Sequence, residues 1–264
     1  IVHREISGKV KSITITRNAT GKYYASILVD NEIEQPKPIQ HMKESDVLGV
    51  DMGLKHLLID SNSNKISNPR FIKRAANNLR RKQKSLSRKK KGTNNRTKAR
   101  LLVAKAHEKT ANARNDFQHK LSRQLVDENQ AIVVETLKVK NMLKNHKLSK
   151  AISDASWRSL ITKLEYKSKD DGKHLVKIDQ WYPSTKTCHI CKEKNSDVVL
   201  GVDSWICPTC STWHDRDINA TFNIKHQGIL KLKAEGLSVS AHRGFCVSLA
   251  LQQATAYEVG SSTL

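Results

Sequence analysis

Short runs of apolar residues recur along the chain and predict strands. Residues 131–135 are almost wholly aliphatic before they end in an acid, and residues 47–54 form an apolar run that carries one acid between glycines. Runs of roughly four to eight such residues between turn signals are typical of buried strands, whereas helices need longer periodic segments. We therefore predict strands in five places: 47–54, 57–59, around Ile66, 131–135 and 175–181.

The N-terminal part of the chain predicts a β-hairpin. Ile13 and Ile15 alternate with threonines, residues 18–21 have a turn sequence, and residues 23–29 form a second apolar strand. A lone hairpin is marginally stable in water, so we expect these strands to complete a sheet or barrel that begins upstream. The chain starts with Ile rather than Met, which indicates a fragment, and the proline-containing segment 31–46 is interpreted as a linker.

Helical spacing dominates the middle of the chain. Helix-forming residues predominate before Gly92, and a helix over residues 101–126 places Phe117, Leu121 and Leu125 on one face. Asymmetric burial of such a face predicts packing against a sheet or another helix.

Two more helices are predicted closer to the C-terminus. Asp154 is a candidate N-cap for a helix through Ser168, whose core stripe comprises Trp157, Leu160, Ile161 and Leu164. A second helix spans residues 215–234 and is ended by Gly236, and the small, polar tail 237–264 is expected to be poorly ordered.

The net charge indicates that the predicted α/β domain has a polyanionic partner. The chain has 47 Lys and Arg residues against 25 Asp and Glu residues, a formal net charge of +22. Such an excess favours nucleic acid. An anionic membrane is the weaker option, because no segment resembles a transmembrane span or a signal peptide. We expect a cytoplasmic protein with no membrane partner.

The positive charge is concentrated in one segment. Residues 62–107 contain no acid. A run of like charge is usually a solvated face or a disordered arm. Here predicted helices flank a short basic loop, which favours a surface that contacts phosphates and contributes affinity without reading sequence. The candidate nucleic-acid-binding residues are Lys73, Arg74, Arg80, Arg81, Lys82, Lys84, Arg88, Lys89, Lys90, Lys91, Arg96, Lys98 and Arg100.

Four cysteines form two Cys-x-x-Cys pairs, Cys188 with Cys191 and Cys207 with Cys210. The alternatives are two disulfides or four unrelated thiols. The spacing falls within the pattern of zinc sites, in which each pair makes a tight turn and an intervening hairpin brings the pairs together. Four thiolates fill the coordination sphere, so we predict one structural zinc ion that catalyses nothing.

Three acids are candidates for catalysis. Asp51 lies within the predicted strand 47–54, Glu135 ends the predicted strand 131–135, and Asp217 follows the cysteines at the start of the last helix. An acid at a strand end can simply face solvent. A mixed sheet with covering helices brings such positions together, however, and converging carboxylates stay charged only around cations, here two magnesium or manganese ions. Two such ions suit phosphodiester hydrolysis.

Taken together, these motifs resemble the TnpB (OrfB) proteins of insertion sequences, often labelled transposases. The matching motifs are Gly-Val-Asp51-Met-Gly-Leu, Val-Val-Glu135-Thr-Leu, Asn141-Met142 with the basic stretch up to Ser156-Trp157, the cysteine pairs, and His214 to Ala220. The resemblance covers residues 47 to about 224.

The resemblance implies a RuvC-type nuclease of the RNase H-like α/β class, with a zinc ribbon inserted before the last helix. It implies RNA-guided, metal-dependent DNA cleavage, with DNA and a guide RNA as partners, in the nucleoid of a prokaryote. The family's three acids correspond to Asp51, Glu135 and Asp217, while Asp215 is a candidate helix cap. Type V CRISPR effectors are related.

The implied domains are a remnant of an N-terminal wedge or oligonucleotide-binding β domain at 1–40, a nuclease domain at 47–183 and 213–236 that includes basic helices at 73–126, a zinc ribbon at 184–212 and a flexible tail at 237–264. Family members usually carry a longer N-terminal part, so the chain is expected to be truncated there. The basic helices fit the region that contacts the guide–target heteroduplex by its shape and backbone.

Two other functions remain open from the residues. One is a nucleic-acid binder that cuts nothing, inactive through truncation. The other is a cut-and-paste transposase of the three-acid class, but there the last acid is generally Glu and no four-cysteine ribbon is expected before it. An actin-like ATPase is disfavoured, because no convincing second phosphate loop accompanies Asp51.

Overall fold

A five-stranded mixed sheet forms the centre of the computed structural model, which describes residues 6–199 and 201–241. In the order β6-β5-β4-β7-β8, the strands are Lys65–Ser67, His56–Asp60, Val47–Asp51, Ala131–Glu135 and His174–Ile178. β4 pairs antiparallel with β5 and parallel with β7, and β7 pairs parallel with β8. All five predicted strands are present, but two end earlier than predicted, at Asp51 rather than residue 54 and at Ile178 rather than Trp181.

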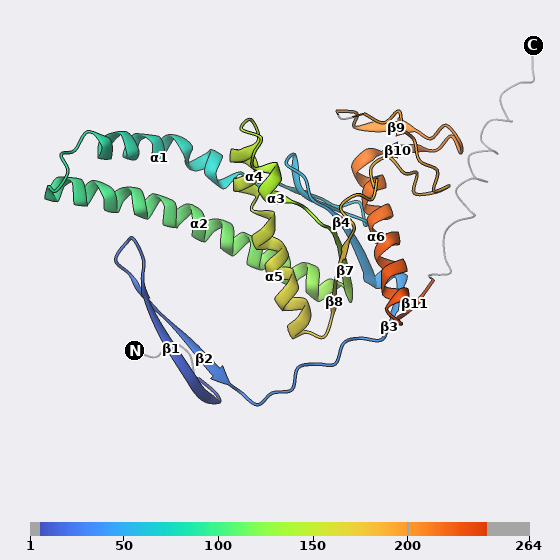
Figure 1. The fold of residues 1–264 in the computed structure, drawn as a ribbon, viewed down its shortest axis with the longest axis horizontal. Helices are drawn as coiled ribbons and strands as arrows, with labels where there is room; N and C mark the ends of the chain where they lie inside the picture. The colour runs from blue at the N-terminus through green and yellow to red at the C-terminus, as the bar shows by residue number, and fades with distance from the viewer. Residues whose placement is uncertain (1–5, 200, 242–264) are drawn as a thin grey trace, which may run out of the picture.

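The two faces of the sheet pack against different helices (Figure 1). Leu48 and Val50 of β4 join a core that also holds Leu121 of α2 (Asn94–Glu128) and Leu160 of α5 (Trp157–Asp170). Alternate residues point to the opposite face, where Val47 and Val133 pack in a second core with residues of α6 (Arg216–Ala234). The result is a layer of helices on each side of the sheet.

Two glycines allow α6 to lie directly on the sheet. A Cβ at Gly49 of β4 would meet the backbone oxygen of Thr221 and would lie 2.7 Å from the backbone nitrogen of Lys225. A Cβ at Gly228 of α6 would collide with the side chain of Val133. Both positions therefore need glycine for the close approach of α6 to β4 and β7.

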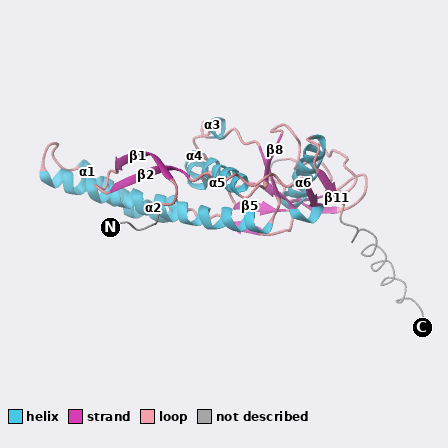
Figure 2. Ribbon diagram, turned by 90° about the horizontal axis from the view of Figure 1, so that it is seen from below, coloured by secondary structure: helices cyan, strands magenta, loops and turns pink. Residues whose placement is uncertain are grey.

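A long helical hairpin extends away from the sheet (Figures 1 and 2). It consists of α1 (Phe71–Ser87) and α2, joined by the basic loop 88–93. The helix expected over 101–126 is confirmed but begins earlier, at Asn94, because the side chain of Thr93 accepts a hydrogen bond from the backbone N–H of Arg96 and caps it. The C-terminal part of α2 covers the sheet, and the remainder lies beyond it.

The predicted role of Asp154 was wrong. The carboxylate of Asp154, in α4 (Ser149–Ala155), accepts hydrogen bonds from the backbone N–H groups of Ile72 and Lys73 and so satisfies the first turn of α1. The helix predicted from Asp154 is instead two helices, because Ser156 has a positive φ of 53° between α4 and α5. A short helix, α3 (Val139–Met142), precedes them.

The N-terminal hairpin, β1 (Lys9–Arg17) and β2 (Tyr23–Asp30), is confirmed and contacts the helical hairpin through its turn. Glu108 of α2 accepts a hydrogen bond from Asn18 Nδ2 and forms an ion pair with Lys22.

The linker and tail predictions were wrong in part. β3 (His41–Lys43) pairs in parallel with β11 (Ser238–Ser240), so short strands stand where a linker (31–46) and a disordered tail (237–264) were expected. A 3₁₀ turn, Glu44–Asp46, leads from β3 into β4. The rest of the tail, from residue 242, lies outside the described residues.

The cysteine segment contains one small hairpin, β9 (Ser204–Ile206) and β10 (Trp213–Asp215), directly before α6. Across the residues that the structure describes, no helix has the length and apolar character needed to span a bilayer.

Candidate functional site

Asp51 and Glu135 are the last residues of two neighbouring parallel strands. The pair directly before them in the register is Val50 with Val134, and both valines face the α2–α5 core. Because side chains alternate along a strand, Asp51 and Glu135 both point to the other face, toward α6. The topology therefore places two carboxylates, far apart in sequence, side by side at one edge of the sheet.

Asp217 lies in the first turn of α6, and Asp215 is the residue that caps the helix. The Asp215 carboxylate accepts hydrogen bonds from the backbone N–H groups of Asp217 and Ile218, each at 3.1 Å, and forms a 2.6 Å ion pair with Lys65. The capping role expected for Asp215 is confirmed. Asp217 is left with a different partner, the guanidinium of Arg216, which donates to its Oδ1 atom at 2.9 Å.

The three acids interact through their charges. The pKa of Asp51 is raised to about 7, first by burial and then by the negative charges of Glu135 and Asp217. Burial also raises the pKa of Glu135, opposed by a hydrogen bond from Ser184. Asp51 therefore lies within electrostatic reach of both other acids, and its ionisation is suppressed unless a cation is near.

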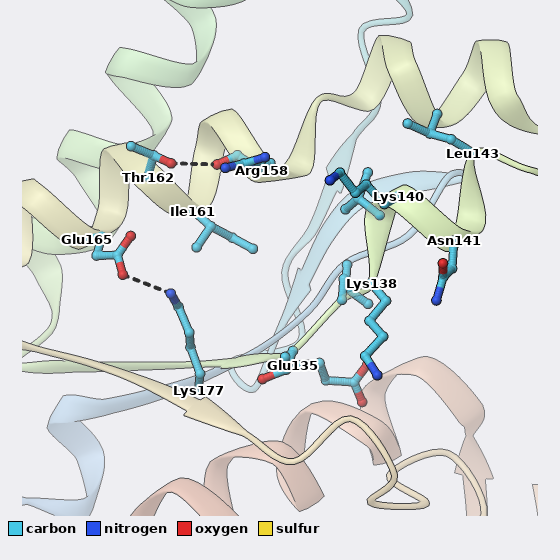
Figure 3. A pocket seen from close by; sticks show the side chains of 13 residues that line it. Glu135, Lys138, Lys140, Asn141, Leu143, Arg158, Ile161, Thr162, Glu165 and Lys177 are labelled. Atoms are coloured by element: carbon cyan, nitrogen blue, oxygen red, sulfur yellow. Dashed lines mark hydrogen bonds and ion pairs between the residues drawn. The ribbon is translucent and has the colours of Figure 1, made fainter.

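The acids line two hollows at this edge of the sheet. Asp51 and Asp217 line a cleft of about 380 Å³ that is also bordered by Lys186. Glu135 lines a larger cleft of about 730 Å³, together with Lys138 and other cations (Figure 3). Space for a substrate therefore exists on both sides of the carboxylates.

Sequence reasoning missed the residues that hold Glu135. Ser184 donates its hydroxyl to Glu135 Oε1, and the Ser184 carbonyl oxygen accepts from Asn223 Nδ2 at 2.9 Å. Asn219, one turn earlier in α6, donates to the Thr187 carbonyl oxygen at 2.8 Å. Both asparagines are buried. The only sequence signal was their four-residue spacing on the helix after Asp217, which places two amides on one face.

The four cysteines converge as predicted. All four are free thiols, and their sulfur atoms lie within 4.8 Å of one another, with 3.6 Å between Cys188 and Cys210 and between Cys191 and Cys207. A disulfide requires about 2.05 Å, so that alternative is excluded. Tetrahedral zinc with bonds of about 2.3 Å separates its sulfurs by about 3.8 Å, which the cluster fits. The four thiols could therefore hold a metal such as zinc.

Aromatic residues enclose this cysteine cluster. Trp205 packs with Cys188 and Cys207 in a small core that is separate from those of the sheet. His214 places its Nε2 atom 3.1 Å from the Cys188 sulfur and is itself buried, and burial lowers its pKa. Groups within hydrogen-bond distance of metal ligands orient those ligands, and His214 occupies such a position beside Cys188. His214 was missed as a site residue, although it directly precedes the acidic motif.

The acids are packed less tightly than the thiols. Within the described residues, the cysteines form the only group of three or more potential ligands whose atoms all lie within 4.8 Å of one another. The acids share an electrostatic field and an edge of the sheet, but they do not reach that density. Their assignment as a catalytic set stays a prediction.

The basic residues lie on the helical hairpin and its loop, as expected. All thirteen candidates are exposed except Lys82 and Arg96, which are half-buried. None of the thirteen forms an ion pair with an acid among the residues described. Arg96 differs from the others, since its guanidinium donates to the carbonyl oxygens of Leu86 and Lys89 and so closes the end of α1.

Comparison with known proteins identifies the class of fold. The chain superposes on a chain of a cryo-EM structure of the CRISPR-Cas12f ternary complex with a TM-score of 0.54 and 19% identity, covering 81% of this chain and 44% of that one. The protein is thus a mixed α/β protein with a fold similar to that of Cas12f.

Two family models match the sequence. The OrfB_IS605 model, described as a probable transposase, matches residues 28–146, and the Cas12f1-like TNB domain matches residues 157–224. A Streptomyces pristinaespiralis protein named "Putative RNA-guided DNA endonuclease" is 42% identical over 83% of this chain and 53% of its own length. InsQ of Escherichia coli K12, named in the same way, is 28% identical over 85% of this chain and 58% of its own length.

Across the matching residues, the chain belongs to the TnpB (OrfB) family, as its motifs predicted. It spans about half the length of the curated relatives it matches.

Proposed function

We propose that the chain is the nuclease core of a transposon-encoded, RNA-guided DNA endonuclease that hydrolyses phosphodiester bonds at Asp51, Glu135 and Asp217. The observation that carries this proposal is the placement of Asp51 and Glu135 at the ends of adjacent parallel strands, with Asp217 close enough that its charge and that of Glu135 add to burial in raising the pKa of Asp51 to about 7. Buried like charges are costly, and proteins keep them together where a cation or a shared proton is used. The mixed sheet with acids at the ends of adjacent strands supports the RuvC-type assignment.

The donor set suits magnesium or manganese, because hard divalent cations prefer carboxylate oxygens. The chemistry that two such ions supply when bound is activation of a water and stabilisation of the leaving oxygen. The chain's own part is to hold the carboxylates. Glu135 is oriented by the Ser184 hydroxyl, and Asp217 is held on the first turn of α6 while Asp215 caps that helix. Asp51 binds a cation in competition with a proton.

The cysteine cluster is assigned to one zinc ion with a purely structural role. Four thiolates leave no open coordination position for a substrate. Asn219 and Asn223 of α6 hold the segment that carries Ser184 and leads into Cys188, which links the cysteine cluster to the acidic centre although the cluster takes no part in the reaction. We keep the expected division into a nuclease domain, an inserted ribbon and an N-terminal β remnant as part of the proposal.

The basic helical hairpin is proposed to contact the backbone of a guide RNA–target DNA heteroduplex. Its lysines and arginines are exposed and lack acidic partners among the described residues. Unpaired surface cations bind phosphates without reading bases, while base pairing with the guide supplies sequence. The names of the relatives, putative RNA-guided DNA endonucleases, support RNA and DNA as partners.

A cleavage assay tests this function. The chain is purified with its bound nucleic acid, that nucleic acid is sequenced, and magnesium-dependent cutting of matched DNA is measured. Asp51→Asn and Glu135→Gln should lower the cutting rate by roughly 10³-fold or more, because bound metal ions contribute several kcal/mol to catalysis. Nucleic-acid binding should survive. Asp203→Asn is the matched control, an exposed carboxylate that lines the same cleft as Asp51. Equal loss in the control, or none in the two variants, rejects the proposal.

A non-cleaving nucleic-acid binder is the second candidate function. Two observations favour it: the acids are packed less tightly than the cysteines, and Arg216 already forms an ion pair with Asp217. It predicts tight binding of nucleic acid with no magnesium-dependent product from the parent chain. The same assay therefore separates the two functions.

A further inference from the structure

Trp181 is an aromatic side chain that the fold holds in solvent. It is 81% exposed, in the loop between β8 and the cysteine ribbon. The loop itself is held, since the Trp181 backbone N–H donates to Asp179 Oδ1 at 2.8 Å and the neighbouring Tyr182 packs against a core of the sheet. A large ring presented on a fixed backbone is a feature of binding surfaces, because packing within the chain does not use it.

The position of this loop is tied to Glu135 on both sides. Three residues before Trp181, Ile178 is the register partner of Glu135, and its carbonyl oxygen accepts a 2.7 Å hydrogen bond from Thr136 Oγ1. Three residues after Trp181, the Ser184 hydroxyl donates to Glu135 Oε1. The exposed ring therefore lies at the edge of the sheet that carries the acids.

Cations lie beside the ring. The Lys138 ammonium is 5.9 Å from the centroid of the Trp181 ring, which is within the range of a cation–π contact. Lys138 lines the 730 Å³ cleft of Glu135 together with Lys140 and Arg158 (Figure 3). Within the part of the chain that the structure describes, none of these three cations forms an ion pair with an acid.

We propose that Trp181 is a stacking platform for an unpaired base of the DNA strand that enters the Glu135 cleft, with Lys138, Lys140 and Arg158 holding the phosphates beside it. An exposed aromatic ring next to unpaired cations is the arrangement by which proteins bind single strands, since each nucleotide offers an aromatic face and a negative charge. A duplex keeps its bases stacked on one another and cannot use the ring. The choice of DNA as the occupant rests on the proposed function.

The test measures binding without cleavage. A fluorescent single-stranded DNA is titrated, without magnesium, into Asp51→Asn protein that carries Trp181→Ala, Trp181→Phe or Trp213→Ala. Trp213 is the matched control, because it is also exposed, at 63%, but lies on the ribbon. Trp181→Ala should weaken binding roughly tenfold, about 1.4 kcal/mol, a usual size for one base–aromatic stack. Trp181→Phe should keep most of the affinity, and Trp213→Ala nearly all.

Two further arms identify the occupant. The affinity for blunt duplex DNA should fall by less than about threefold in Trp181→Ala, since the bases of a duplex cannot reach the ring. Lys138→Ala should reduce the slope of log affinity against log salt concentration for single-strand binding by about one, as expected for the loss of one phosphate contact. Equal losses for Trp181→Ala and Trp213→Ala, equal losses for duplex and single strand, or a loss confined to single-stranded RNA would each overturn the proposal.

The outcome is independent of whether the chain cuts. A parent that binds single strands through Trp181 but yields no product would reject the nuclease function and keep the platform. If the parent cuts DNA but Trp181→Ala leaves the single-strand affinity unchanged, the nuclease function is kept and the stacking platform is rejected.

Discussion

The cysteine cluster and the acidic centre both gather negative charge, but they are built in opposite ways. The cysteines come from residues 188–210, and their sulfurs lie within 4.8 Å of one another. The acids come from residues 51, 135 and 217, and they act on one another mainly through their field. Four thiolates close a coordination sphere, whereas three carboxylates leave positions for water and substrate. The cysteine cluster, built from neighbouring residues, is suited to stabilising the local fold. The acidic centre, built from distant residues with open coordination positions, is suited to catalysis.

The two sites meet in the loop before the ribbon. Asn219 and Asn223 of α6 hold the carbonyl oxygens of Thr187 and Ser184, and the Ser184 hydroxyl holds Glu135. Helix α6 therefore anchors the loop that leads into Cys188, and Ser184 in the same loop contacts the acidic centre. Perturbing each site separately should show whether the loss of one site affects the other.

Metal removal should have the largest effect. A strong chelator should unfold the ribbon, because its small core surrounds the thiols and structural zinc contributes about 10 kcal/mol or more at neutral pH. Hydrogen exchange should show protection lost in residues 188–214 and retained in β4 and β7. Cys191→Ser should reproduce this, with Cys246→Ser as the control, because Cys246 is the one cysteine of the sequence outside the two Cys-x-x-Cys pairs. Simultaneous loss of protection in the sheet would mean that the ribbon is not a separate unit.

The acidic centre should make stability depend on pH. In the metal-free protein the pKa of Asp51 is raised to about 7, above its value in the unfolded chain, so the native state binds the extra proton. Stability should therefore fall as pH rises from about 4 to 7 and then level off. Asp51→Asn should remove this decline and add on the order of 2–4 kcal/mol above pH 7.

Urea unfolding across this pH range is the measurement. Magnesium should restore the stability of the parent above pH 7 but leave Asp51→Asn unchanged. Parallel pH curves for the two proteins would contradict the raised pKa of Asp51.

The close contact between α6 and β4 should be the next most sensitive feature. Gly49→Ala would place a methyl group against the backbone of Thr221 and Lys225 and should destabilise the protein by roughly 1–3 kcal/mol, as overpacking does. Gly92→Ala is the control, because a Cβ there meets nothing within 4 Å, although its positive φ carries a smaller cost. Chemical denaturation measures both. Comparable losses would show that the close approach of α6 does not matter.

Ser184→Ala should have the smallest effect and the most specific one. Loss of the hydroxyl leaves the Glu135 carboxylate without the hydrogen bond that lowers its pKa, so the pKa should rise further. The acid limb of the cleavage profile should move to higher pH, with about a tenfold lower rate at neutral pH. Ser184→Thr keeps the hydroxyl and should restore both. A lower rate with an unshifted profile would indicate a merely structural role.

The sequence predicted features that depend on local pattern. The cysteine spacing, the strand carrying Asp51 and the cap at Asp215 each follow from a few adjacent residues, and all are confirmed. Contacts between distant segments were not predictable. Asp154 caps α1 rather than its own helix, and Ser184 reaches Glu135 across 49 positions, because tertiary packing decides which donor meets which acceptor.

The pairing of β3 with β11 was missed for a related reason. Both strands have three residues, and each has one buried apolar residue, Met42 or Val239, between exposed ones. Such short runs resemble linker and tail sequence until the partner strand is known.

Manganese binding tests the central claim most directly, which is that the three acids form one cation-binding centre. With the cysteine cluster loaded with zinc, Mn²⁺ is titrated into the parent and into Asp51→Asn, Glu135→Gln and Asp217→Asn, and bound ion is counted by electron paramagnetic resonance. Each variant should weaken binding at least about tenfold, because each removes a ligand charge from a shared site, while Asp203→Asn should not. Unchanged Mn²⁺ affinity in all three variants would contradict the account.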